Sequence, residues 1–341
     1  MQKLLFGLLF LLLIPFTTPL HANSLDMMQQ QDPGAELWNA VRGRGETDTG
    51  TIRSQVKGMD SEVLVNRGGD NWRFFRMDFL VPTAAMVLGI TAVLIILFRL
   101  VRGKIKIKAG RSAYKIKRFS SFQRLVHWVT AILFVGLAIT GMCLWFGREL
   151  LIPYLGPELG GDIMWLMKRI HDFSSPAFGL SLVILALTFL KGNFPHPRDL
   201  LWIVKGGGLL KWHAPAGRYN AGEKIWYWVA IVGGGFIVFS GAFLLFPNLI
   251  GVSRNAITYY HWIHGIAAIV LITGAMGHIY MGTIAMEGAF ECMSTGYADA
   301  NWAKEHHDVW YEEMREQGQI GVLEDEADTA QQQDAYRQST A

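Results

Sequence analysis

Five long apolar runs constrain the fold of this chain more than any other feature. Each is close to the ~20 residues that a helix needs to cross a bilayer, and none shows the alternation of a strand. Only helices and closed barrels satisfy their backbone groups in lipid, so we expect an all-α membrane protein. With 51% hydrophobic and 17% charged residues, the composition favours the same class. The predicted spans are Asp78–Leu100, Leu125–Phe146, Ile163–Leu190 (apolar from Phe173), Ile225–Phe246 and Thr258–Met286.

The charges between these runs predict which loops face the cytoplasm. Arg102–Arg124 holds nine basic residues and no acid, and Lys191–Lys224 holds six more basic residues. The positive-inside rule places both loops in the cytoplasm and leaves Gly147–Asp162 and Pro247–Ile257 outside. The C-terminal segment 287–341 is then cytoplasmic. A net charge of only +3 gives no support to a nucleic-acid partner.

The N-terminus is typical of an exported chain. Met1–Ala22 has a basic start at Lys3, a short apolar stretch and a small residue at its end, which predicts a secretory signal cleaved after Ala22. An uncleaved anchor is the alternative. Asn23–Met77 is polar and rich in glycine, and we expect it to be a small periplasmic segment that leans on a partner. An exported N-terminus gives the same orientation as the loop charges.

Two further segments have a distinct composition. Lys104–Lys117, KIKIKAGRSAYKIK, alternates basic and apolar residues. This pattern is compatible with a short basic hairpin on the membrane surface or with a solvated loop held by anionic headgroups, so membrane lipid is an expected contact. The last residues, EDEADTAQQQDAYRQSTA, are predicted to be disordered because they lack apolar side chains to bury.

Two histidines lie fourteen residues apart in the last apolar run, at His264 and His278. On a helix this spacing brings the two side chains to within about 40° of one face and roughly 21 Å apart along the axis. Ionisable side chains inside a membrane are expensive and usually functional. Two more, His127 and His171, lie near the starts of the second and third runs.

Depth in the membrane pairs these histidines. The directions of the helices place His127 with His278 at cytoplasmic depth and His171 with His264 at periplasmic depth. A single membrane histidine is equally compatible with a polar helix contact, but two depth-matched pairs favour ligation of two haem irons. Bis-histidine ligation leaves no open iron position, which favours electron transfer. No C-x-x-C sequence occurs, which argues against a c-type haem or a cysteine-ligated iron–sulfur cluster.

The remaining histidines are weaker candidates. His261 precedes His264 by three residues, but it lies about 100° away from the face of His278. We rank it second, as a hydrogen-bonding neighbour. His21 leaves with the signal. Surface positions are predicted for the loop and tail histidines, His196, His213, His306 and His307.

The sequence RYNAGEK, just before the fourth run, is a candidate quinone site. Asn220, Gly222 and Glu223 would lie near the haem held by His127 and His278. A quinone needs hydrogen-bond partners for its carbonyl groups and a route for protons, and Asn220 and Glu223 offer both. The alternative is a helix N-cap with an acid in the first turn, and both roles can hold at once.

Five motifs occur in an order that resembles a known family. RLVHWVTAILFVGLAITG, RIHDFSSPAFG, RYNAGEK, HWIHGIAAIVLITGAMGHIYMGTI and WAKEHHDVWYEE resemble the cytochrome b (gamma) subunit of membrane-bound formate dehydrogenases, from about Phe119 to Glu313. ELWNAVRGRG and NRGGDNWR resemble its longer form, which adds a signal peptide and one helix.

The resemblance implies a fold and an organisation. The fold would be a transmembrane four-helix dihaem cytochrome b bundle with one additional N-terminal transmembrane helix. The implied divisions are a signal peptide at 1–22, a periplasmic segment at 23–77, the extra helix at 78–100, a basic cytoplasmic loop at 101–124, the dihaem domain at 125–286 and a cytoplasmic tail at 287–341.

The resemblance also implies cofactors and partners. His171 and His264 would hold the periplasmic haem b, and His127 and His278 the cytoplasmic one. A menaquinone or ubiquinone would contact Asn220, Gly222 and His278, whereas Glu223 stands where related sequences can carry Gln. A catalytic subunit with a molybdenum or tungsten pterin and an iron–sulfur subunit would complete the complex in the bacterial inner membrane.

The residues of this chain leave other functions open. None of them is expected to touch formate, so the chain would be an electron-transfer and quinone-reducing subunit without formate chemistry of its own. In the cytochrome b of a related respiratory enzyme, such as a hydrogenase or a thiosulfate reductase, the chemistry of this chain would be nearly identical. A cofactor-free membrane anchor or transporter is the alternative from another class.

Overall fold

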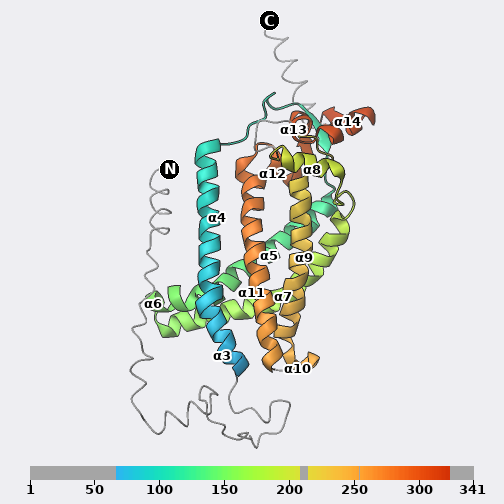
Figure 1. Cartoon of the computed structure of the whole chain (residues 1–341). Helices are drawn as coiled ribbons and strands as arrows, with labels where there is room; N and C mark the ends of the chain where they lie inside the picture. Colours follow the sequence, from blue (N-terminus) through green and yellow to red (C-terminus); the bar gives the residue numbers. More distant parts are fainter. Residues whose placement is uncertain (1–66, 208–213, 253, 323–341) are drawn as a thin grey trace, which may run out of the picture. The chain divides into compact units, whose positions relative to one another are not determined.

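The computed structural model describes residues 67–207, 214–252 and 254–322 (Figure 1). The predicted signal peptide, most of the predicted periplasmic segment, His21, His213 and the acidic C-terminal end lie outside these residues. The chain divides into two compact units. One contains Met1–Ala85 and Phe246–Trp262, and the other contains Met86–Leu245 and Ile263–Ala341.

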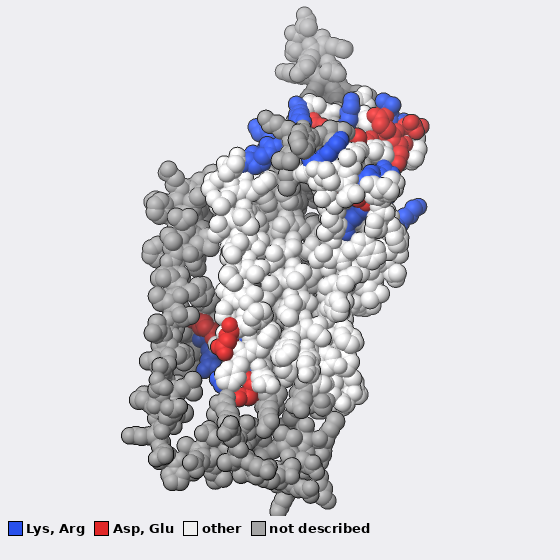
Figure 2. Space-filling view, viewed as in Figure 1, with Lys and Arg blue, Asp and Glu red and all other residues white. Residues whose placement is uncertain are grey.

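The described chain is mostly helical, and five of its helical segments have the length and composition of membrane spans. This confirms the predicted all-α membrane fold. The spans are Asp70–Arg102, Ser121–Leu150, Pro157–Phe189, Ala221–Leu245 and Ala256–Ala285. In the view of Figure 2, the described surface over the middle of the helices is almost entirely uncharged; most of the visible charged residues lie near α13 and α14, and a smaller group lies at the lower left.

The helices of the smaller unit are α3 (Arg67–Phe74), η2 (Phe75–Leu80) and α10 (Pro247–Ile250), with the first residues of α4 (Val81–Arg102) and α11 (Arg254–Tyr280). Aromatic rings join its two segments. Trp72 stacks on His261 with ring centres 4.4 Å apart, and Phe75 packs against Trp262. His261, the second-ranked histidine of the last run, therefore packs against an aromatic ring.

The larger unit is organised by α5 (Ser121–Leu150), α7 (Pro157–Phe189) and α9 (Ala221–Leu245). Helices α5 and α7 pack along each other and lie inclined to α9 (Figure 1). Short α6 (Ile152–Leu155) connects α5 to α7. A buried cluster of Leu137, Phe178 and Leu182 fills the contact between α5 and α7.

Local signals fix the starts of these helices. Ser120 and Gln123 form a reciprocal capping box, in which Ser120 Oγ accepts from the Gln123 amide at 3.1 Å. Helix α7 starts with Pro157 after Gly156, whose φ of 81° is open to glycine and strained for other residues. Helix α8 (Pro197–Val204) is capped by the exposed His196, whose Nδ1 accepts from the Arg198 amide at 3.2 Å. The surface prediction for His196 is confirmed.

A small sheet lies beside the helices of the larger unit. Strand β1 (Tyr114–Lys117) is central and pairs antiparallel with β2 (Tyr297–Asp299) and β3 (Ile320–Val322). Strand β1 forms only the end of the basic segment 104–117, and its partners are distant strands, so this segment is not a local hairpin; residues 104–113 lie before the strand and are mostly exposed. The partner strands lie about 180 residues (β2) and about 200 residues (β3) further along the chain, so a local sequence pattern does not reveal them.

The C-terminal segment is folded as far as Val322. After η3 (Met281–Ala285), it contains α12 (Ala289–Ser294), α13 (Ala300–His306) and α14 (Asp308–Glu316). Ile116, Cys292, Trp302 and Trp310 form a buried core with these elements. His307 has no exposed surface, so the surface position predicted for it is wrong: the apolar faces of α13 and α14 close over it. His306 is partly buried.

We predict that Asp299→Ala will loosen the segment between β2 and α14. Its buried carboxylate accepts hydrogen bonds from the amides of Ser112, Asn301 and Trp302, at 2.9, 2.9 and 3.3 Å. Loss of a capping side chain costs ~1–2 kcal/mol. Limited proteolysis of the detergent-purified protein should then cut this segment faster. The matched control, Glu312→Ala, removes an exposed carboxylate and should leave the rate unchanged; equal rates in wild type and Asp299→Ala would contradict the prediction.

Candidate functional site

One histidine pair joins α7 to α11. The ring centres of His171 and His264 are 6.3 Å apart, and the planes of the two rings are inclined by 70°. The two residues come from different helices and lie 93 positions apart in the sequence. Helix packing in the larger unit therefore brings them together.

Hydroxyl groups from neighbouring helices hold the outer nitrogens of this pair. Thr140 Oγ1 lies 2.9 Å from His171 Nδ1, and Ser240 Oγ lies 3.1 Å from His264 Nδ1. Each hydroxyl donates its own proton to a carbonyl one turn earlier, that of Gly136 at 2.9 Å or of Phe236 at 2.6 Å. Each hydroxyl therefore accepts from the ring N–H, which places the proton on Nδ1 and leaves the lone pair on Nε2.

A glycine follows each of these hydroxyl residues. A Cβ added at Gly141 would lie 3.4 Å from His171 Cε1, and one added at Gly241 would lie 3.4 Å from His264 Cε1. The backbones of α5 and α9 thus approach the two rings in the same way. Small residues permit this close approach between membrane helices.

The second pair joins α5 to α11. The ring centres of His127 and His278 are 6.3 Å apart, with an interplanar angle of 59°. Trp226 stacks on His278 with ring centres 5.2 Å apart. Gly274 makes room for this indole, because a Cβ there would lie 2.6 Å from the Trp226 ring. His127 Nδ1 is buried and has no hydrogen-bond partner among the described residues.

The separation within each pair fits a metal held between two imidazoles. A nitrogen bound to a metal lies about 2 Å from it, so two rings on opposite sides of one metal have centres roughly 6 Å apart. Both pairs meet this requirement at 6.3 Å. Two neutral nitrogen ligands from opposite sides are the donor set of a bis-histidine haem. The residues present therefore fit the group that the sequence predicts.

The predicted quinone residues lie together at the start of α9. The Asn220 amide donates to Glu223 Oε2 at 3.1 Å, and the Glu223 amide donates to Asn220 Oδ1 at 2.9 Å. This reciprocal pair forms the N-cap that was the alternative for these residues. A Cβ at Gly222 would lie 3.1 Å from Trp202. Trp226, which stacks on His278, follows about one turn later, so α9 links this turn to the second histidine pair.

Arg118 holds the carboxylate of Glu223. Its Nη2 donates to both carboxylate oxygens, at 3.0 and 2.9 Å, and to the Arg218 carbonyl at 2.7 Å. The Arg118 side chain is buried, whereas Glu223 is partly exposed. His307 stands beside them, with Nε2 3.5 Å from Arg118 Nη2 and Nδ1 2.8 Å from the Gly217 carbonyl. Burial, and then the charge of Arg118, lower the pKa of His307 to about 4.

The model of a known family matches residues 118–296, which is more than half of the chain and includes all four paired histidines. Its description is prokaryotic cytochrome b561. The chain belongs to the prokaryotic cytochrome b561 family. Membership implies haem b and a role in membrane electron transfer.

Curated relatives carry names that agree with this family. The chain is 28% identical over 205 residues to the Escherichia coli K12 protein named formate dehydrogenase, cytochrome b556(fdo) subunit, covering 59% of this chain and 93% of the relative. It is 27% identical to the nitrate-inducible cytochrome b556(Fdn) subunit of the same organism, over 58% and 91%. It is 29% identical to the cytochrome b556 subunit of Haemophilus influenzae Rd, over 58% and 83%.

Sequence reasoning missed several residues of this cytochrome. Thr140 and Ser240 each precede a glycine within an apolar run. This hydroxyl–glycine pair is the sequence pattern that could have pointed to them as contacts of the paired histidines. Arg118 was counted only as one charge of a basic loop. His307 lies in WAKEHHDVWYEE, a motif that was used for the resemblance alone. Arg118 contacts Glu223 and His307, and each of these contacts joins residues more than 100 positions apart in the sequence.

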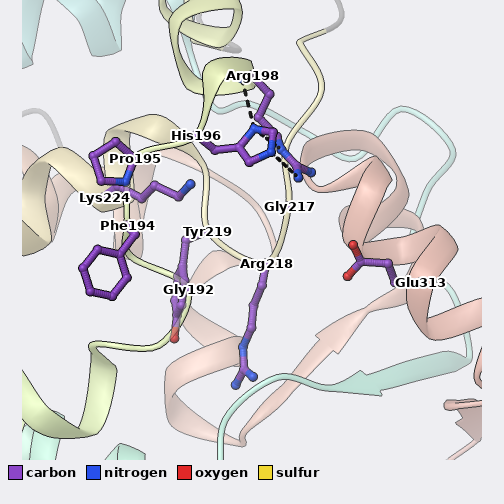
Figure 3. Close-up of a pocket in the computed structure, with 10 residues that line it drawn as sticks. All are labelled: Gly192, Phe194, Pro195, His196, Arg198, Gly217, Arg218, Tyr219, Lys224 and Glu313. Atoms are coloured by element: carbon purple, nitrogen blue, oxygen red, sulfur yellow. Dashed lines mark hydrogen bonds between the residues drawn. The ribbon is translucent and has the colours of Figure 1, made fainter.

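A pocket of about 300 Å³ opens beside the start of α9 (Figure 3). Lys224 and Glu313 stand on opposite sides of it. Lys224 forms an ion pair with Asp199 at 2.9 Å. The described lining includes Tyr219 and Lys224, which flank that turn, but not Asn220, Gly222 or Glu223. It is lined by Gly192, Phe194, Pro195, His196, Arg198, Gly217, Arg218, Tyr219, Lys224 and Glu313.

We predict that the folded C-terminal segment loses stability as the pH falls below about 6.5, because His307 is buried as the neutral form. Its pKa of about 4 lies below the ordinary 6.5, so the unfolded chain binds more protons between these values. The contribution of the neutral His307 to the free energy of unfolding is complete above about pH 6.5. It falls by up to ~3 kcal/mol as the pH approaches 4.

Thermal unfolding of wild type and His307→Gln at about pH 7 and about pH 4.5 checks this contribution. The variant should be less stable than wild type at the higher pH and should lose part of the pH dependence. An unchanged pH dependence in His307→Gln would rule out this role for the imidazole.

Proposed function

We propose that this cytochrome is the dihaem subunit of a formate dehydrogenase, which carries electrons from an iron–sulfur subunit across the membrane to a quinone. The two histidine pairs carry the proposal. Each pair has its ring centres 6.3 Å apart and unites two helices. Their members on α11, His264 and His278, are separated by about 21 Å along the helix axis. Two haem b groups would thus lie at two depths of one bundle.

The chain would hold each haem by the two imidazoles of one pair. A bis-histidine haem supplies reversible one-electron transfer without an open iron position. Helices α5, α7 and α11 supply the four rings, and the apolar packing between α5 and α7 excludes water from the bundle. His171 and His264 would hold the periplasmic haem, and His127 and His278 the cytoplasmic one.

Quinone reduction would take place near the start of α9. A quinone takes up two electrons and two protons to become a quinol. Asn220 Oδ1 is occupied by the Glu223 amide, so its Nδ2 group is the donor available to a quinone carbonyl. Gly222, which packs against Trp202, would contact the quinone beside Asn220, and His278 would stand at the haem side. Arg118 and the capping box hold Glu223, which favours a positioning role for this carboxylate.

The orientation of the subunit follows from its loop charges. The positive-inside rule places the N-terminal segment in the periplasm and the C-terminus in the cytoplasm of the bacterial inner membrane. Electrons would move inward while protons are taken from the cytoplasm, which builds a membrane potential. The quinone would be menaquinone or ubiquinone. The relatives' names support formate dehydrogenase as the complex, so the partners would be a molybdenum or tungsten pterin subunit and an iron–sulfur subunit.

The processing and the divisions of the chain remain predictions. They comprise a signal peptide cleaved after Ala22 and a periplasmic segment to Met77. An extra helix at 78–100 and a basic loop at 101–124 would precede the dihaem domain at 125–286 and the tail.

We expect two haem b groups per chain in the purified complex, measured by pyridine haemochrome absorption against protein concentration. His127→Ala and His171→Ala should each reduce this number to one, because each removes one ligand of a different pair. His196→Ala is the matched control: this exposed histidine caps α8 and belongs to neither pair, so both haems should remain. One haem or none in the wild type would contradict the proposed function, as would two haems in either pair variant.

A further inference from the structure

The two histidine pairs differ in what their outer nitrogens contact. In one pair, His171 and His264 each donate Nδ1–H to a side-chain hydroxyl, at 2.9 and 3.1 Å. In the other pair, the buried Nδ1 of His127 has no hydrogen-bond partner among the described residues, and His278 stacks on an indole. The ligands of the two predicted haems therefore have different electronic surroundings.

The hydroxyl contacts are built into the helices. Thr140 is 4% exposed, and Ser240 is completely buried. Each hydroxyl is oriented by its bond to a carbonyl of its own helix and accepts from a ring on the neighbouring helix. The same arrangement occurs twice, from α5 to α7 and from α9 to α11.

A hydrogen bond from the outer nitrogen changes the ligand in a known direction. It fixes the tautomer and the ring orientation, and it raises the basicity of the nitrogen that faces the metal. A more basic imidazole stabilises the ferric state over the ferrous state and so lowers the reduction potential. Hydrogen bonds to the outer nitrogens of the ligating rings are one of the means by which proteins set haem potentials.

We propose that Thr140 and Ser240 are positioning residues that lower the reduction potential of the haem at His171 and His264 below that of the haem at His127 and His278. This inference rests on the proposed function, in which each pair holds a haem b. The resulting difference in potential favours electron movement from the periplasmic to the cytoplasmic side. Neither hydroxyl belongs to the turn at the start of α9 where quinone reduction is proposed.

The test is a redox titration of the intact complex that carries Thr140→Val or Ser240→Ala. Each change removes the acceptor with little change in volume. We expect the lower of the two transitions to move upward and the higher one to stay in place. Loss of a hydrogen bond to a metal-ligating histidine commonly costs about tenfold in metal affinity or activity. A tenfold change in the oxidised-to-reduced ratio is ~59 mV for a one-electron couple.

The low-spin ferric signal of the same haem in electron paramagnetic resonance should move with the potential, because the ring loses its fixed orientation. Thr140→Ser keeps the acceptor and should restore both readouts. A structural role alone predicts neither the shift of one transition nor the rescue.

Two other buried hydroxyls of the same helical bundle serve as matched controls. Thr130 Oγ1 donates to the Val126 carbonyl on α5 at 2.8 Å, and Ser181 Oγ donates to the Phe178 carbonyl on α7 at 2.8 Å. Among the described residues, neither hydroxyl forms a hydrogen bond with an imidazole. Thr130→Val and Ser181→Ala should therefore leave the lower transition unchanged.

The outcomes separate this inference from the proposed function. A wild-type complex with fewer than two haems refutes the proposed function. Two haems with an unmoved lower transition in both Thr140→Val and Ser240→Ala refute the positioning role and leave the proposed function standing. An equal shift in the control variants also refutes the positioning role.

Discussion

The placement of imidazole rings within apolar helices is the constraint on which the rest of this structure depends. A polar ring nitrogen in a low-dielectric interior costs free energy unless it has a partner. His171 and His264 satisfy one nitrogen each with a hydroxyl from the next helix. Their other nitrogens, and one nitrogen of each ring in the second pair, would be satisfied by iron placed between rings whose centres are 6.3 Å apart. The geometry of metal ligation and the need to satisfy buried ring nitrogens thus favour the same arrangement of the four histidines.

Two features of the surrounding fold support the histidine pairs: the close approach of neighbouring helices to the rings and the capping of α9. Glycines at 141, 241 and 274 let helix backbones and an indole reach the rings. At the other end of α9, the capping box of Asn220 and Glu223 is held by Arg118, which in turn lies beside the buried His307. The C-terminal segment therefore supports the turn where quinone reduction is proposed, although it lies far away in the sequence.

What could be predicted from the sequence followed from helical periodicity. Apolar runs of helical length gave the five spans, and fourteen-residue spacing put His264 and His278 on one stripe. The missed features are long-range. Strand β1 pairs with residues about 180 positions away, and His307 is buried because α13 and α14 fold back over Arg118. The roles of Thr140 and Ser240 required the register between neighbouring helices, which periodicity within one helix does not specify.

The central claim is that each histidine pair holds one iron. The most direct measurement is an anomalous difference map at the iron absorption edge from crystals of the intact complex. This account predicts two iron peaks in the chain, one between the rings of His127 and His278 and one between those of His171 and His264. A single peak, or peaks away from these rings, would contradict it.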